Sequence, residues 1–133
     1  MPARAEQGRI LVVEDDKIVA DTLGQILAAN GYEIEIAYSA EEATNKLANW
    51  TPDLGILDVM LPKMNGIELG VILEEIGCQV LLFSGQPAVE ILVEKARIEG
   101  HDFEILAKPV HPSVMLSTVS SKLCAYREAR HSA

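Results

Sequence analysis

Four short apolar runs each lead into polar residues that could take part in chemistry. These residues are Glu14, Asp15 and Asp16 after the first run, Asp58 within the second, Ser84 near the end of the third and Lys108 after the fourth. Carboxylates with no His or Cys beside them are ligands for a hard divalent cation such as Mg²⁺ or Mn²⁺. A carboxylate can also accept a phosphoryl group when a metal ion and an ammonium group neutralise the developing charge.

The acids need positive charge beside them if folding brings them together. Two like charges about 5 Å apart repel by roughly 3 kcal/mol at an effective dielectric constant of about 20. Lys108 supplies one positive charge, and a divalent cation would supply the rest. In this interpretation Asp58 is the nucleophile, while the Ser84 hydroxyl and the Lys108 ammonium each bind one phosphoryl oxygen.

The pattern along the chain predicts the elements that position these residues. Strands are expected at 9–16, 33–39, in the first part of 54–66, at 78–85 and at 103–108, and helices are expected to begin near residues 17, 39, 66, 87 and 113. Alternating strands and helices with right-handed crossovers give a doubly wound α/β domain, whose parallel sheet has helices on both faces. Ligands of such sheets bind at the carboxyl ends of the strands, where the polar residues fall.

Length and charge narrow the class of protein. The 133 residues fit one domain, with a core from about 9 to 127 and short flexible ends. A net charge of -9 excludes direct binding to nucleic acid, and no membrane contact is expected because the chain has no apolar run of membrane-spanning length. With no signal peptide visible, we expect a cytoplasmic protein. Cys78 and Cys124 form no metal-binding or disulfide pattern.

Four motifs in a fixed order resemble those of the receiver domain of two-component response regulators. They are VVEDD at 12–16, LDVMLPKMNG at 57–66, LFSG at 82–85 and AKPV at 107–110. The resemblance covers nearly the whole chain. It implies a flavodoxin-like (βα)₅ fold with strand order 2-1-3-4-5, like that of a stand-alone, chemotaxis-type regulator.

The resemblance also implies a role for individual positions. Asp58 would be the phosphoacceptor and would bind the metal with Asp15 and the backbone carbonyl of Met60, while Glu14 would act through a water molecule. Ser84 and Lys108 would bind the phosphoryl group and form the switch, Lys108-Pro109 would be a cis peptide bond, and Gly66 would be structural.

One position departs from the family pattern. The family often has an aromatic residue three positions before the lysine, where it reports the phosphorylated state, and this chain has Ile105 there. Phe103 lies two residues earlier, so in a strand its side chain points the same way as Ile105. How the switch works without the usual aromatic is left open.

The expected function is a phosphorylation-dependent switch with output by protein contact. The expected partners are a histidine kinase or phosphotransfer protein and a downstream protein, with a homodimer left open, and no separate turnover substrate is expected. An alternative is a Mg²⁺-dependent phosphatase of the haloacid dehalogenase type, but its D-x-D signature is absent after the first strand, where Glu14, Asp15 and Asp16 stand. A third hypothesis is that the domain is a docking scaffold that works without phosphorylation.

Overall fold

Five strands and five helices alternate along the chain in the computed structural model, which describes residues 8–85 and 89–132. The elements are β1 (Arg9–Val13), α1 (Lys17–Ala29), β2 (Glu33–Ala37), α2 (Ala40–Leu47), β3 (Leu54–Asp58), α3 (Gly66–Glu75), β4 (Gln79–Ser84), α4 (Val89–Ile98), β5 (Glu104–Ala107) and α5 (Pro112–Ser132). The order predicted from the sequence is confirmed.

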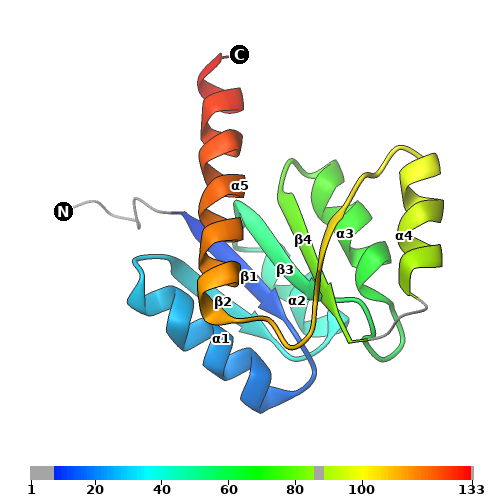
Figure 1. Ribbon diagram of the computed structural model, residues 1–133, viewed down its shortest axis with the longest axis horizontal. Helices are drawn as coiled ribbons and strands as arrows, with labels where there is room; N and C mark the ends of the chain where they lie inside the picture. The colour runs from blue at the N-terminus through cyan, green and yellow to red at the C-terminus, as the bar shows by residue number, and fades with distance from the viewer. Residues whose placement is uncertain (1–7, 86–88, 133) are drawn as a thin grey trace.

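All five strands belong to one parallel sheet with the order β2-β1-β3-β4-β5. Helices α1 and α5 cover one face, and α2, α3 and α4 cover the other (Figure 1). The doubly wound, flavodoxin-like architecture is therefore confirmed. In this arrangement the carboxyl ends of β1, β3, β4 and β5 meet at one rim of the sheet.

Two apolar clusters hold the helices on the sheet. On one face, Leu23 and Leu27 of α1 and Val119 of α5 pack against β-strand residues such as Ile56. On the other face, Leu69 and Leu73 of α3 pack with Leu57 and the alanines of α2. Adjacent residues of β3 thus enter opposite clusters, as a strand buried on both faces requires. None of the helices in the described part of the chain has both the length and the apolar character of a membrane span.

Most element ends differ from the sequence prediction by a few residues. β1 ends at Val13, because the chain turns so that the Asp16 side chain caps α1 by accepting hydrogen bonds from Ile18 N and Val19 N. Lys108 follows β5 directly. The predicted start of a helix at Pro87 lies outside the described residues. α5 remains helical to Ser132, through residues that were expected to fray.

Only some of the apolar residues in and just after α3 are fully buried. Leu69 and Leu73 are fully buried, but Ile72 and Ile76 are 37% and 50% exposed. Gly70 is also buried, and a Cβ there would lie 3.2 Å from the Phe103 ring. The glycine lets the aromatic ring approach the helix backbone, so the helix contacts the core through its Leu69, Gly70 and Leu73 side.

Candidate phosphoacceptor site

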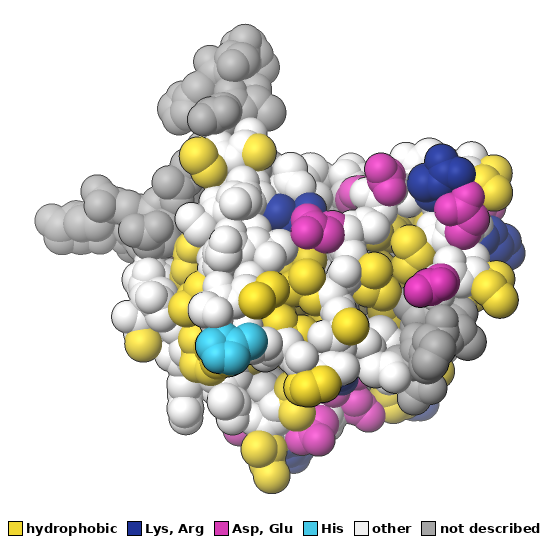
Figure 2. Space-filling view, in the orientation of Figure 1, with side chains coloured by type: hydrophobic (Ala, Val, Ile, Leu, Met, Phe, Trp, Pro, Cys, Tyr) yellow, Lys and Arg dark blue, Asp and Glu magenta, His cyan; other side chains and the backbone are white. Residues whose placement is uncertain are grey.

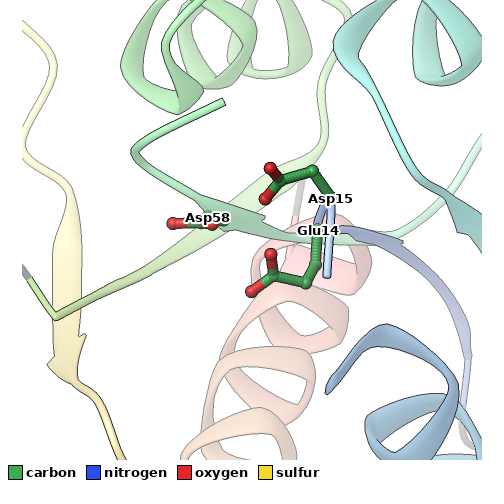
Figure 3. A group of neighbouring side chains, drawn as sticks. All are labelled: Glu14, Asp15 and Asp58. Carbon is green, nitrogen blue, oxygen red and sulfur yellow. The ribbon is translucent and has the colours of Figure 1, made fainter. Parts of the chain in front are cut away.

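Three carboxylates from two strand ends gather at the carboxyl rim of the sheet. Glu14 and Asp15 follow β1, and Asp58 is the last residue of β3 (Figure 3). One oxygen from each lies within 4.8 Å of the other two. Glu14 and Asp58 are buried, whereas Asp15 is exposed. The acids predicted to converge therefore do so, although Asp15 reaches the cluster from the solvent side.

The Lys108 ammonium group enters this cluster from the far end of the sequence. Its Nζ lies 2.6 Å from Oε1 of Glu14 and 3.3 Å from Oδ2 of Asp58. The other Glu14 oxygen accepts a hydrogen bond from Asp16 N at 2.9 Å. Among the described residues, no buried side-chain nitrogen or oxygen lacks a hydrogen-bond partner. The buried glutamate is thus paired in charge and hydrogen-bonded, as burial of a charge requires.

The pKa values of Asp15 and Lys108 are both raised, which favours the neutral form of the acid and the charged form of the amine. The pKa of Asp15 lies above its ordinary value, mainly because of a side-chain hydrogen bond with Glu14, and further because of burial and the Glu14 charge. Burial alone lowers the pKa of Lys108, but the hydrogen bond to Glu14 and the charges of Asp58 and Glu14 outweigh it. The Lys108 pKa is therefore raised, and the stability from its pairing is lost only as pH rises through that raised value.

The backbone around Asp58 is fixed from two sides. Asp58 pairs with Phe83 of β4, and Val59 N donates to Phe83 O at 3.2 Å. Beyond the strand, Gly66 N donates to Val59 O at 2.8 Å, and Met60 N donates to Oδ1 of Asp58 at 3.1 Å. These bonds hold the carboxylate at the rim with one oxygen oriented by the chain that follows it.

A glycine is needed at position 66 because two backbone segments meet there. A Cβ on Gly66 would lie 2.2 Å from the Asp58 carbonyl oxygen and 2.9 Å from the Val59 Cα. Both are backbone atoms, which cannot move aside as the end of a flexible side chain can. Gly66 therefore fixes where α3 begins relative to the Asp58 carboxylate.

The remaining predicted residues lie on or shortly after β3, β4 and β5. Ser84 ends β4, is buried and pairs with Ala107, and its carbonyl accepts from Lys108 N at 2.9 Å. The Lys108-Pro109 peptide bond is cis. Ile105 packs against the cluster that contains Phe103, on the sheet face covered by α2, α3 and α4. The Met60 side chain is exposed.

The acid cluster fits a small divalent cation. Ligand oxygens of an octahedral Mg²⁺ lie about 2.1 Å from the ion, so opposite ligands are separated by about 4.2 Å. The three carboxylate oxygens lie within 4.8 Å of one another, which is close to this separation. The donors are oxygens only, which favours Mg²⁺ or Mn²⁺ over softer metals. Three carboxylates beside one ammonium also leave an excess of two negative charges for the ion to balance.

Comparison with known proteins identifies the family. The family model of the response regulator receiver domain matches residues 10–120. The chain belongs to this family. Receiver domains are phosphorylation-dependent signalling switches of two-component systems that act with histidine kinases and downstream targets, and they bind Mg²⁺ at an acidic pocket. The cluster of Glu14, Asp15 and Asp58 has the composition of such a pocket.

Relatives and solved structures agree with this assignment. The chain is 46% identical over 61 residues to the response regulator MprA of Mycobacterium sp. (strain KMS), a match that covers 46% of this chain and 26% of that protein. The matched segment thus spans about a quarter of the length of the curated relatives it matches. A CheY-like response regulator receiver domain protein from Methanospirillum hungatei JF-1 is 33% identical, with a TM-score of 0.81, over 91% of this chain and 97% of that one. A receiver domain from Francisella is 25% identical, with a TM-score of 0.76, over 89% and 98% of the two chains.

Sequence reasoning missed one residue of the site. The sequence places Phe83 in an apolar strand and gives it no role in the site, but its ring centroid lies 4.7 Å from Nζ of Lys108. The available signal was its position next to Ser84, which places a large ring at the carboxyl rim of the sheet. The sequence could not show that the lysine lies over the ring, because 25 residues separate the two positions.

We predict that Gly66→Ala moves the Asp58 backbone and lowers phosphoryl uptake from acetyl phosphate. Overpacking against backbone costs about 1–3 kcal/mol, or more where neither segment can yield. Gly77→Ala is the matched control: its φ is 91°, so the change is strained, but no atom lies within 4 Å of the added Cβ. Urea unfolding should show a loss of stability in both variants, while phosphoryl uptake falls only in Gly66→Ala. Wild-type uptake in Gly66→Ala would contradict this account.

We predict that Asp15→Asn raises the free energy of unfolding of the metal-free protein at neutral pH. A raised pKa means that the folded state favours the neutral carboxyl group, so the ionised form lowers stability. That loss disappears as pH falls through the raised pKa, and the advantage of the variant should disappear with it. Urea unfolding of both proteins in a chelator at low salt, from neutral to acidic pH, measures the stability advantage of Asp15→Asn and its dependence on pH. An advantage that grows on acidification would contradict the assigned direction.

Proposed function

We propose that this receiver domain accepts a phosphoryl group on Asp58 from a histidine kinase or phosphotransfer protein. Asp15, Asp58 and the Met60 backbone carbonyl would hold Mg²⁺ or Mn²⁺, and Glu14 would act through a water molecule. The observation that carries the proposal is the meeting of three carboxylates with one ammonium group at a single sheet rim. Structural acids have no reason to collect beside Asp58 with an excess of negative charge.

The contacts of the acids support this division of roles. Both Glu14 oxygens have short contacts, 2.6 Å to Lys108 Nζ and 2.9 Å to Asp16 N. Asp58 has longer ones, 3.1 Å from Met60 N and 3.3 Å from Lys108 Nζ. Asp15 is exposed and can reorient. Asp58 and Asp15 are therefore the acids most available to a metal ion, whereas Glu14 anchors the lysine.

The chain's own residues account for the transfer chemistry. An oxygen of Asp58 attacks phosphorus, the bond from phosphorus to the donor nitrogen breaks, and an acyl phosphate forms on Asp58 as the donor imidazole leaves with the electron pair. The bound cation supplies charge neutralisation for the phosphoryl oxygens. Lys108 binds one of these oxygens as a point charge, and the Ser84 hydroxyl hydrogen-bonds another. Hydrolysis of the acyl phosphate later resets the switch.

The proposed output is protein contact rather than turnover of a substrate. Phosphorylation would draw the Ser84 hydroxyl toward the phosphoryl group and change the surface that a downstream protein reads. The partners we propose are one phosphodonor and one downstream protein, in the cytoplasm, with a homodimer as a further assembly. The family match does not favour the haloacid dehalogenase alternative, because the acids after β1 lack that signature.

We predict that acetyl phosphate and Mg²⁺ add one base-labile phosphate to the wild-type protein and none to Asp58→Asn. The amide of the variant is no nucleophile for phosphorus, while its shape is nearly unchanged. Asp102→Asn makes the same chemical change at an exposed residue before β5 and should retain full uptake. Intact-protein mass spectrometry measures the added phosphate. Uptake by Asp58→Asn would assign the phosphate to another residue, and many turnovers of a phosphomonoester would instead indicate a phosphatase.

A further inference from the structure

The Lys108 ammonium group rests on an aromatic ring as well as on two carboxylates. Its Nζ lies 4.7 Å from the centroid of the Phe83 ring. This is within the distance of about 6 Å at which a cation is attracted to the face of a ring. The side chain of Phe83 is almost fully buried, so little water competes with this attraction. Three groups therefore define where the ammonium lies: Glu14, Asp58 and Phe83.

The position of the ring is fixed by the same backbone that positions the phosphoacceptor. Phe83 pairs with Asp58 in the register of β3 and β4, and its carbonyl accepts a hydrogen bond from Val59 N. It directly precedes Ser84. The backbone at Asp58 is therefore joined to the Phe83 backbone, while the Lys108 ammonium contacts the Phe83 ring directly.

Phe83 and Lys108 also border an apolar groove at the surface. Phe83 and Lys108 line a cavity of about 570 Å³ together with Ile18 and Val19 of α1 and Pro109 and Val110 of the β5–α5 connection. Figure 2 shows hydrophobic side chains exposed on this face of the molecule, beside α5. Ile18 is 80% exposed. One ring therefore touches both the lysine of the site and the surface between α1 and α5.

The other aromatic residue near β5 is on the wrong face for this purpose. Phe103 packs with Ile105 in the cluster under α2, α3 and α4, and its ring abuts Gly70. No contact of Phe103 with Lys108 appears among the described residues. Phe83 belongs to the opposite cluster, under α1 and α5. The aromatic ring that contacts the phosphorylation site thus faces the α1 and α5 side of the sheet.

We propose that Phe83 positions the Lys108 ammonium for the incoming phosphoryl oxygen and couples the phosphorylation of Asp58 to the groove between α1 and the β5–α5 connection. This inference rests on the proposed function. When Asp58 carries a phosphoryl group, the phosphoryl oxygens attract the Lys108 ammonium away from Glu14 and from the Phe83 ring. The ring then repacks, and the groove residues that contact it change their environment. The coupling is reciprocal, so a change at the ring alters how well the site takes up phosphate.

The test replaces Phe83 site-specifically with 3,4,5-trifluorophenylalanine. This residue nearly keeps the shape of the ring and removes the negative electrostatic potential of its face, which attracts the ammonium. We expect the rate of phosphorylation by acetyl phosphate to fall about threefold, the size expected from losing one cation–π contact. The methyl NMR shifts that beryllofluoride induces at Ile18 and Val110 should shrink. Phe83→Leu, which removes the ring, should lower both readouts further and should abolish the ring-current shift of the Lys108 Hε protons.

Leu81→Val is the matched control, because Leu81 lies on the same strand and in the same cluster as Phe83 and is fully buried. It should lower thermal stability while leaving the phosphorylation rate and the groove shifts as in the wild type. A trifluorophenylalanine variant with wild-type rate and groove response would overturn the inference and leave the proposed function intact. A wild-type protein that takes up phosphate without any response of Ile18 or Val110 would also overturn it. A wild-type protein that takes up no phosphate would overturn both.

Discussion

The site depends on one ion pair across 94 residues of sequence, between the Lys108 ammonium and the Glu14 carboxylate. Glu14 is almost completely buried, and a buried carboxylate is stable only when it is paired in charge and hydrogen-bonded. Lys108 supplies the charge, and Asp16 N supplies a further hydrogen bond. The Lys108 ammonium also contacts Asp58. The ion pair that stabilises the buried Glu14 carboxylate therefore also holds the positive charge of Lys108 beside the phosphoacceptor.

The rest of the fold can be understood as the support for this pair. Parallel strands in the order β2-β1-β3-β4-β5 bring the carboxyl ends of β1, β3, β4 and β5 to one rim, and the Lys108 side chain, which follows β5, contacts Glu14 there. Gly66 allows α3 to begin directly against the Asp58 backbone. Phe83 lies beneath the ammonium and extends the site to the groove beside α1. Each of these features acts on where the lysine lies.

The sequence predicted the architecture and the convergence of the acids because both follow from short-range rules. Strand and helix alternation predicts a parallel sheet whose strand ends share a rim, so Asp58 and Lys108 could be placed at the same rim without coordinates, while the strand order came from the resemblance. The sequence could not predict that the Phe103 ring packs against Gly70 of α3, because the two residues are far apart along the chain. It also missed the role of Phe83. An aromatic residue in an apolar strand does not indicate which distant lysine will contact its ring in the folded protein.

A double-mutant cycle on Lys108 and Glu14 in a chelator tests the central claim most directly. Lys108→Met leaves a buried carboxylate without its cation, Glu14→Gln leaves the cation without its buried acid, and the combined variant removes both charges. The account predicts that the combined variant loses much less stability in urea than the sum of the single variants, with a coupling energy of at least about 1.5 kcal/mol. Losses that add within about 0.5 kcal/mol would show that the pair does not organise the site.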